Sequence, residues 1–263
     1  MEPHELQERI AEFPRWHYRF DFGDGVTTPV LDRGRVNRHE QRRRYFFDAL
    51  LQVTGGSLRG RRVLDLGCNA GLWSLNAIEA GADFVLGVDI RQTHIDQASL
   101  VFAAKGVDES RYRFERGDVF EHDFGEPFDV VLCLGLLEHV AKPVELFERM
   151  AAADAEILVL DTGLSRASSS CFEVSSLDEP DDHGALVLVP TRAAVIELAD
   201  RFGFHAVPLA RNMTDYTGMD DYRALRRLAF LCSRSVSLAM LPRETASPLA
   251  ARWATMIDSV RRG

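Results

Sequence analysis

The spacing of apolar and polar residues changes several times along the chain, and each change predicts an element. Short apolar runs of the kind found in buried strands occupy residues 63–66, 84–88, 112–116, 129–134 and 156–160. Between them, glycine stops or a proline start mark the helices that the pattern predicts over 72–80, 93–105 and 143–152. Strands that alternate with helices in this way predict parallel pairing with right-handed crossovers.

The chain before this alternation has a different pattern. Residues 4–12 predict a short charged helix, and residues 13–29 combine many aromatic side chains with turn signals. Residues 37–53 predict a further helix, in which Asn37 is the cap and Glu40 completes a capping box. We interpret this part of the chain as a cap, either packed against the sheet or folded over the site.

The chain after the fifth predicted strand also changes character. Residues 163–184 form a long stretch rich in serine and acidic residues, which is too long for an ordinary connection. This stretch leaves the carboxyl end of a strand, where open α/β sheets bind ligands. Thr191 then caps a helix over 192–202, and residues 204–209 and 228–232 predict two strands that form an antiparallel edge.

These elements predict an α/β fold with a doubly wound, mostly parallel, seven-stranded Rossmann-like sheet and an N-terminal helical and aromatic cap. The Gly55-Gly56 pair marks the expected boundary, which divides the chain into a cap over 1–55 and a ligand-binding domain over 56–263. We expect the insertion at 163–184 to lie over the active site. The 263 residues, 46% of them apolar, are enough for this arrangement.

One stretch carries the strongest chemical signal, R-V-L-D-L-G-C-N-A-G-L-W-S-L from residue 62 to 75. It predicts a strand, a tight glycine turn and a helix start, which is the nucleoside-binding corner of a doubly wound sheet. A dinucleotide fold has a third glycine where this chain has Asn69. Asp65 just upstream would repel a pyrophosphate but attract an ammonium group. An enzyme that uses NAD or another nucleotide stays open as an alternative.

The segment D-L-G-C-N-A-G-L-W-S resembles the first motif of class I S-adenosylmethionine (SAM) methyltransferases. This resemblance implies SAM as the cofactor and S-adenosylhomocysteine (SAH) as its product. It implies that Asp89 holds the ribose, that Asp118 and Val119 hold the adenine, and that Leu134 and Gly135 line the floor near the sulfonium. The full set of implied cofactor-binding residues is Asp65, Gly67, Cys68, Asn69, Gly71, Trp73, Asp89, Ile90, Gly117, Asp118, Val119, Leu134 and Gly135.

A wider resemblance covers roughly residues 13 to 210. The segments W-H-Y-R-F-D-F-G-D-G-V-T-T-P, G-A-D-F-V-L-G-V-D, L-C-L-G-L-L-E-H and L-V-P-T-R-A-A-V are similar to the bacterial family that modifies the wobble uridine of tRNA. That family uses SAM or a carboxylated derivative of SAM, and many relatives resemble small-molecule methyltransferases of secondary metabolism. This chain departs from the wobble-uridine pattern at Glu138-His139, where a tyrosine–histidine pair is common.

Net charge bears on the choice between these acceptors. The chain has a formal net charge of −9, whereas proteins that grip nucleic acid usually carry a basic excess. One stretch, residues 33–44, is locally rich in arginine. It is interpreted either as a solvated helix face or as an RNA contact through Arg38, Arg42, Arg43 and Arg44. Binding to tRNA is therefore disfavoured but stays open.

Methyl transfer to a hydroxyl needs alignment and a base. His139 follows the fourth predicted strand and is the first candidate for the base, against a structural role as a cap. His17 and His183 are second candidates, and Asp161 could assist at the end of the fifth strand. The expected substrate-binding residues are Trp16, His17, Tyr18 and His183. No spacing of residues indicates a metal site.

Cysteine usage and hydropathy bound the setting. Four cysteines without a C-x-x-C pair suit a reducing cytoplasm, and no apolar run is long enough for a membrane span. The sequence therefore predicts a cytoplasmic SAM-dependent methyltransferase, compatible with a homodimer, that methylates a small molecule at oxygen in secondary metabolism. The alternatives are a tRNA wobble-uridine enzyme that uses SAM or carboxy-SAM, and a SAM-binding regulator without catalytic activity.

Overall fold

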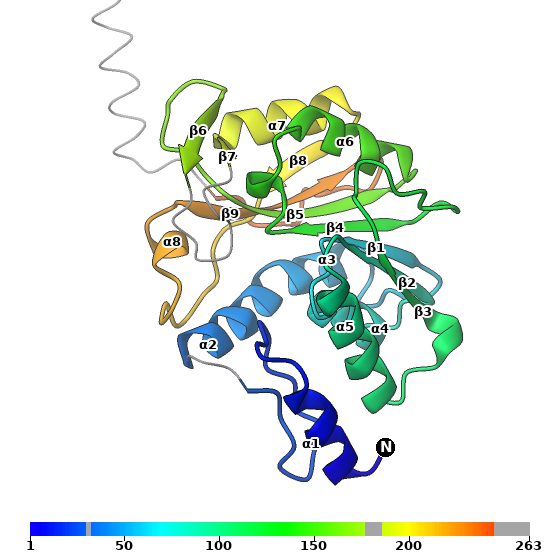
Figure 1. Ribbon diagram of the computed structural model, residues 1–263. Helices are drawn as coiled ribbons and strands as arrows, with labels where there is room; N and C mark the ends of the chain where they lie inside the picture. The colour runs from blue at the N-terminus through cyan, green and yellow to red at the C-terminus, as the bar shows by residue number, and fades with distance from the viewer. Residues whose placement is uncertain (30–32, 177–185, 245–263) are drawn as a thin grey trace, which may run out of the picture.

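A computed structural model describes residues 1–29, 33–176 and 186–244 of the chain. In this part of the chain, seven strands form one sheet in the order β3-β2-β1-β4-β5-β9-β8 (Figure 1). Their bounds are β1 Arg62–Leu66, β2 Phe84–Asp89, β3 Tyr112–Arg116, β4 Val130–Leu134, β5 Ile157–Gly163, β8 His205–Pro208 and β9 Arg227–Ser233. The first five strands pair in parallel, and β9 runs antiparallel to β5 and β8, which confirms the predicted sheet.

Helices cover both faces of the sheet (Figure 1). The helices α3, α4 and α5 lie on one face, whereas α6 and α7 lie on the other. The helical segments are α1 Pro3–Ala11, α2 Arg33–Arg42, the π-helical η1 Arg43–Phe47, α3 Asp48–Val53, α4 Leu72–Glu79, α5 Gln92–Ala104, α6 Pro143–Ala152, α7 Arg192–Arg201 and α8 Asp220–Arg223, with short 3₁₀ turns η2 Glu109–Arg111 and η3 Leu137–His139. This layering follows from the right-handed crossovers of a parallel sheet.

The helix predicted from Asn37 starts earlier, because α2 begins at Arg33. Asn37 is therefore not its cap; the Asn37 amide instead donates to the backbone oxygens of Thr217 and Asp215, at 2.8 and 3.3 Å. The predicted capping box fails because a tertiary partner takes the side chain. At the other end, Thr191 caps α7 as predicted, and its hydroxyl accepts from the Ala194 amide at 3.2 Å.

The insertion at 163–184 contains a strand that the sequence analysis missed. Strand β6, Phe172–Ser176, pairs antiparallel with β7, Leu186–Pro190, as a separate two-stranded sheet. The alternation in F-E-V-S and the run L-V-L-V were the available signals for these strands. Strand β7 packs against η3, which follows β4, so this hairpin lies by the carboxyl edge of the main sheet. Residues 177–185, and His183 with them, lie outside the described residues.

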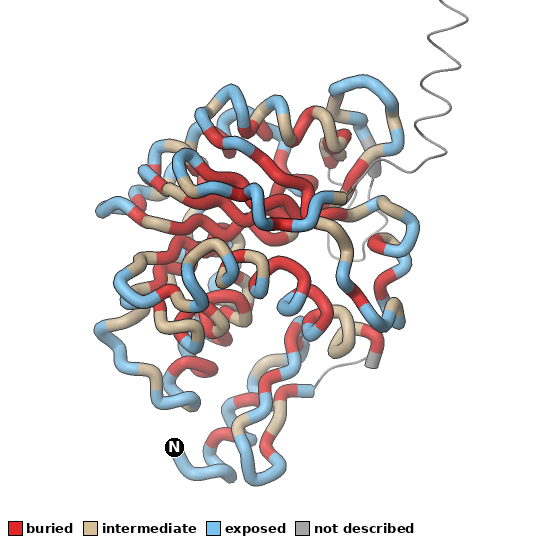
Figure 2. Tube along the Cα trace, turned by 180° about the vertical axis from the view of Figure 1, so that it is seen from behind, coloured by how far each residue is buried: buried red, intermediate tan, exposed pale blue. Residues whose placement is uncertain are grey.

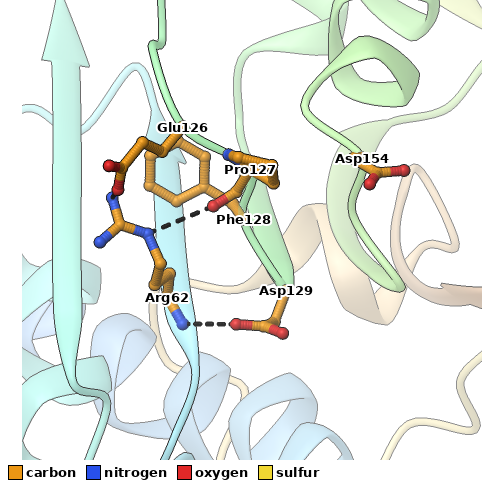
Figure 3. A pocket seen from close by; sticks show the side chains of 6 residues that line it. All are labelled: Arg62, Glu126, Pro127, Phe128, Asp129 and Asp154. Carbon is orange, nitrogen blue, oxygen red and sulfur yellow. Dashed lines mark hydrogen bonds and ion pairs between the residues drawn. The ribbon is translucent and has the colours of Figure 1, made fainter.

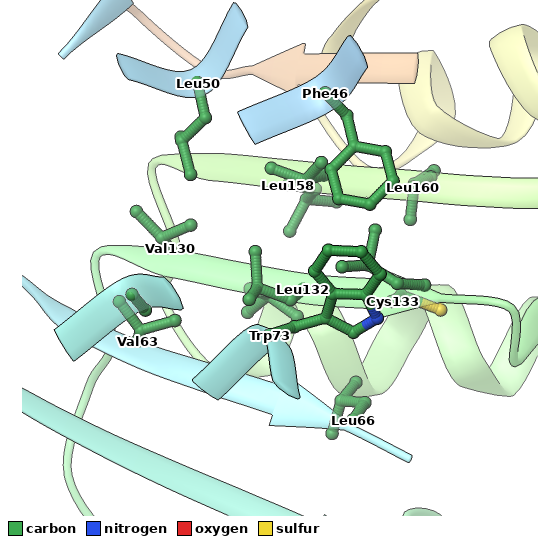
Figure 4. Close-up of a cluster of buried hydrophobic side chains, with 14 of the residues drawn as sticks. Phe46, Leu50, Val63, Leu66, Trp73, Val130, Leu132, Cys133, Leu158 and Leu160 are labelled. Atoms are coloured by element: carbon green, nitrogen blue, oxygen red, sulfur yellow. The ribbon is translucent and has the colours of Figure 1, made fainter. Parts of the chain in front are cut away.

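The hydrophobic core is continuous from the cap into the sheet (Figure 2). Figure 4 shows Phe46 and Leu50 of the cap above Leu158 of β5, with the ring of Trp73 below that of Phe46 and beside Leu132 of β4. The expected boundary at residues 55 and 56 falls between α3 and β1, yet both sides contribute to one cluster of buried residues. None of the helices in the described ranges has the length and apolar character that a bilayer span requires.

Candidate active site

The glycine loop after β1 has the backbone geometry of a close-approach turn. Gly67 and Gly71 have φ angles of +71° and +78°, and Asn69 also adopts the left-handed region with φ of +50°. A Cβ at Gly71 would lie 3.1 Å from Ala98 and 3.2 Å from Phe114, so the loop packs directly against its neighbours. Cys68 is buried beneath the loop. A glycine turn of this shape leaves main chain exposed for contact with a ligand.

Asp65 lies under this loop and is almost wholly buried. Its carboxylate accepts a hydrogen bond from the Ser74 hydroxyl at 2.6 Å. Burial raises the pKa of Asp65 to about 7, against the opposing effect of the hydrogen bonds from Ser74. Asp65 is therefore poised to gain or lose a proton near neutral pH, and a nearby ammonium group would favour its charged form.

Asp89 ends β2 and anchors the same loop from the other side. Its Oδ2 accepts from the Asn69 amide at 2.9 Å, and its Oδ1 accepts from the Arg91 amide at 2.9 Å and lies 3.1 Å from Nδ1 of His94. Burial opposes ionisation, but these interactions hold the pKa of Asp89 below its usual range. Oδ2 keeps a lone pair for a further donor, as a ribose hydroxyl would supply. Next to it, Ile90 is 61% exposed.

The turn after β3 contains Gly117, Asp118 and Val119, and its acid is exposed. Asp118 is exposed, and its carboxylate accepts from the Phe120 amide at 3.0 Å. Gly117 donates its amide to the carbonyl of Asp89 at 3.0 Å, which ties this turn to the end of β2. Val119 is buried beside them. The predicted adenine-side residues thus lie next to Asp89 and Ile90, on the same edge of the sheet.

The ends of β4 and β5 carry buried charges. Gly135 follows β4 with φ of +94°, and its amide donates to the Asp161 carbonyl at 2.8 Å, beside the largely buried Leu134. The Asp161 carboxylate is fully buried and lies 2.8 Å from the Arg42 guanidinium. The Tyr222 hydroxyl donates to the same oxygen at 2.5 Å. This geometry commits Asp161 to holding the cap, and it does not favour the predicted role in proton transfer.

The same network continues away from Asp161. Arg227 pairs with Glu138 and, at 3.1 Å, with Asp221. Asp221 in turn forms a two-pronged pair with Arg38, at 2.7 and 2.6 Å. Burial opposes the charge on Glu138, but Arg227 holds its pKa below the usual range. Three arginines thus balance three carboxylates at this end of the sheet, because Arg38, Arg42 and Arg227 face Asp161, Glu138 and Asp221.

The cap residues nearest the glycine loop form a cluster of rings. Tyr18 packs edge-on against His39 at 4.6 Å between ring centroids, and His39 lies 6.5 Å from Trp73. Trp73 is 1% exposed, so it serves as a wall of the core rather than an open contact surface. Its indole Nε1 is one of the buried polar atoms without a well-directed hydrogen bond among the described residues.

His17 keeps an accessible ring although protein surrounds it on several sides, and its ring lies 5.3 Å from that of His39. Desolvation by this surrounding, together with the charges of Arg35 and Arg42, lowers the pKa of His17 to about 3. His17 is therefore neutral at physiological pH, and its weak basicity makes it a poor general base.

The other predicted acceptor-side residues are spread more widely. Trp16 is buried, and its indole donates to the Ile10 carbonyl at 3.2 Å, so it is committed to packing within the cap. His139 is exposed in η3, directly after β4. His183 lies outside the described residues.

Sequence reasoning missed Glu138, Tyr222 and Arg227 as parts of the site. It assigned Arg38 and Arg42 only to a solvated face or an RNA contact. The network partners are separated in sequence by as many as 183 residues, so no local pattern could have joined them.

A cavity also lies away from the glycine loop. It has a volume of about 520 Å³ and is lined by Arg62, Phe128 and Asp129 at the amino ends of β1 and β4 (Figure 3). Its charges are already paired, since the Arg62 guanidinium meets Glu126 and its amide donates to Asp129. This hollow is at the opposite edge of the sheet from the glycine loop. No group of side chains in the described residues is arranged to hold a metal ion.

Comparisons with known proteins bear first on the central segment. Residues 63–154 match the family model described as a methyltransferase domain. Ubiquinone biosynthesis O-methyltransferases are similar over this part: that of Neisseria meningitidis serogroup C is 34% identical over 94 residues, which are 36% of this chain and 40% of the relative. That of Bordetella avium is 36% identical over 39% of this chain and 42% of the relative. The chain thus spans about two-fifths of the length of these relatives.

Solved structures match over more of the chain. The N-terminal domain of EvdMO1, crystallised with SAH and D-fucose, has a TM-score of 0.65 and 21% identity, and the match covers 88% of this chain and 96% of that one. The magnesium protoporphyrin IX methyltransferase of Synechocystis, with bound SAM, has a TM-score of 0.57, 17% identity and coverage of 88% and 91%. The [4+2]-cyclase SpnF has a TM-score of 0.56, 15% identity and coverage of 89% and 93%. The chain therefore has the fold of class I SAM-dependent methyltransferases, with a methyltransferase-domain match over residues 63–154.

Proposed function

We propose that this protein is a SAM-dependent methyltransferase that transfers a methyl group to a hydroxyl of a small molecule. The observation that carries the proposal is the carboxyl edge of β1 and β2. There, a positive-φ glycine loop is tied to Asp89, which keeps an acceptor lone pair beside the exposed side chain of Ile90. This arrangement fits an adenosine: Asp89 for the ribose and the Ile90 surface for the adenine ring.

The other residues fit the remaining parts of the cofactor. The main chain of the loop from Gly67 to Gly71 lies where the methionine half would bind, and the buried acid Asp65 favours its ammonium group. Gly135 has nothing closer than 3.9 Å to the position of a Cβ, so its backbone also leaves room. SAM supplies the electrophilic methyl group. The chain contributes alignment, which accounts for much of the rate in reactions of this kind.

We propose His139 as the general base for a hydroxyl acceptor. It is accessible, follows β4 directly and belongs to the edge of the sheet that carries the glycine loop. We expect His139→Gln to lower kcat by about 100-fold, in the range typical of lost acid–base catalysis, while SAH affinity stays unchanged. A kcat within twofold of the wild type would assign His139 a structural role.

The acceptor class rests on two observations. The partial relatives are O-methyltransferases of ubiquinone biosynthesis, as their names state. The arginines that would serve an RNA contact are also partly used, because Arg38 and Arg42 pair with carboxylates of this chain and only Arg43 and Arg44 are exposed. A wobble-uridine acceptor therefore ranks second. Tight binding of tRNA that falls steeply with salt would reverse this order.

The proposed function is tested by native mass spectrometry of the purified protein, followed by calorimetric titration with SAH. Retained SAM or SAH, or a dissociation constant in the micromolar range, is the expected result. A retained carboxylated derivative would favour the wobble-uridine reaction. A protein that retains nothing and fails to bind SAH would overturn the proposal. SpnF shows why binding and turnover need separate tests, since a chain of this fold is described as a cyclase.

A cytoplasmic location and a homodimer belong to the same proposal. Fractionation of the source cells and light scattering of the purified chain would test these two points.

A further inference from the structure

One face of helix α2 carries three arginines, and two of them pair with a carboxylate of the described residues. Arg35, Arg38 and Arg42 are three and seven positions apart, so their side chains leave the helix on one side. Arg38 pairs with Asp221 at 2.6 Å, and Arg42 pairs with Asp161 at 2.8 Å. Arg35 is half-buried, and no residue in the described ranges pairs with its guanidinium.

This face points toward the ring cluster of the cap. His39, four positions after Arg35 on the same side, packs 5.3 Å from His17 and 4.6 Å from Tyr18. His17 is the accessible member of the cluster. Arg35 is near enough to His17 for its charge to act on the imidazole, and neither side chain is fully buried. The segment that carries His17 contacts α5, since Gln97 donates to the Arg15 carbonyl at 2.7 Å, and His94, which lies 3.1 Å from Asp89, also acts on His17.

The electrostatics of this place favour an anion. The charges of Arg35, Arg38 and Arg42 all disfavour a proton on His17, and burial and Arg42 lower the pKa of His39 to about 2. Burial and the surrounding arginines keep both histidines neutral, so the positive charge at this place is that of the arginines, and Arg35 is the one without a carboxylate partner among the described residues. The two other arginines of the row show how this chain neutralises such charge, because each meets a carboxylate.

We propose that Arg35 and His17 form a carboxylate-binding subsite at the mouth of the active site, filled by the ligand rather than by the chain. The guanidinium of Arg35 pairs with the carboxylate, and the imidazole N–H of His17 donates to it. The shared chemistry is a single carboxylate, which an acidic acceptor or the amino-acid end of the cofactor supplies. This inference rests on the proposed function for its location but not for its test.

The first arm of the experiment uses benzoate and benzamide as matched probes that differ in charge but hardly in shape. Calorimetry or ligand-observed NMR measures both, with the free protein and with the SAH-saturated protein. We expect the wild type to prefer benzoate by at least about tenfold, since hydrogen bonds to charged groups contribute more than neutral ones. Arg35→Gln is expected to remove this preference. Arg44→Gln, which changes an exposed arginine in the following π-helical segment η1, is the matched control and should keep the preference.

The second arm separates the two sources of the carboxylate. SAH and its decarboxylated analogue are titrated into the wild type and Arg35→Gln. If the substitution weakens SAH about tenfold but leaves the analogue unchanged, the cofactor fills the subsite. If SAH is unaffected and benzoate preference persists in the SAH-saturated wild type, an acidic acceptor fills it.

Equal binding of benzoate and benzamide, together with equal losses for SAH and its analogue in Arg35→Gln, would overturn the inference. Failure of the wild type to bind SAH would instead overturn the proposed function, because the benzoate arm in the free protein does not need the cofactor.

Discussion

The two halves of the candidate site are built in different ways. On the cofactor side, Asp65, Asp89 and the glycine loop between them lie within 25 residues of sequence, and backbone amides make several of their contacts. On the other side, at the ends of β4 and β5, where we expect the acceptor and which we call the acceptor side, Arg42, Asp161 and Tyr222 come from three distant segments and meet through side chains alone. The cofactor side consists of turns that follow successive strands. The contacts on the acceptor side form only when the cap packs against the sheet.

The difference also appears in the acids. The pKa of Asp65 is raised because burial outweighs the hydrogen bonding from Ser74. The pKa of Asp89 is lowered because several donors outweigh burial. On the acceptor side, Glu138 is held ionised by Arg227 against complete burial. His94 and two backbone amides stabilise the charge of Asp89 on one side, whereas an arginine stabilises that of Glu138 on the other. The cofactor half should therefore tolerate changes in the cap that the acceptor half does not.

The largest expected effect comes from breaking the acceptor-side network. Arg227→Ala leaves Glu138 and Asp161 buried with one cation fewer, so the free energy of unfolding should fall by about 3–5 kcal/mol. Urea denaturation measures the loss. Arg234→Ala, which removes an exposed pair with Asp154, should cost about 0–1 kcal/mol. Similar losses in the two variants would contradict the difference between buried and surface pairs.

The next effect concerns the proton on Asp65. Its folded pKa of about 7 lies above the unfolded value of 3.8, so its contribution is fully present below about pH 4 and is lost as pH rises toward 7. Asp65→Asn keeps the contact with Ser74 but removes the titration. Across this window the wild type should lose about 4 kcal/mol of stability relative to Asp65→Asn, at roughly 1.4 kcal/mol per pKa unit. Parallel stability curves from denaturation at several pH values would refute the buried-acid assignment.

The next prediction concerns the affinity for SAH and compares Asp89 with Asp118. Asp89→Ala removes the proposed ribose acceptor and the anchor of the Asn69 amide, so SAH affinity should fall by about 100-fold, as for a lost charge-assisted hydrogen bond with further loop disorder. Isothermal titration measures it. Asp118→Ala, at an exposed position, should cost about tenfold or less. Undiminished affinity of Asp89→Ala would sink the proposed cofactor site.

The smallest expected effect concerns Thr191, the helix cap that the sequence predicted correctly for α7. Thr191→Ala removes the cap of α7 and should cost about 1 kcal/mol in urea denaturation, whereas Thr191→Ser should keep most of the stability. A loss in both variants would show that packing of the Thr191 methyl group, and not the hydrogen bond, is what matters.

Local sequence determined most of the cofactor half. Periodicity located β1, α4, β3 and α6 to within a residue or two, and the glycine spacing placed the turn, because these features depend on contacts between near neighbours. It was wrong at Asn37, whose side chain bonds to a distant part of the chain, and it missed β6 and β7, which pair with each other and whose alternation was a local signal.

Tertiary structure alone decided the acceptor half. Arg42 has the same local context as Arg43, yet one is buried against Asp161 and the other is exposed. The direction of each side chain follows from where the helix docks, and that docking joins residues more than 100 positions apart. A buried charge finds its partner through the fold, so its role cannot be read from neighbouring residues.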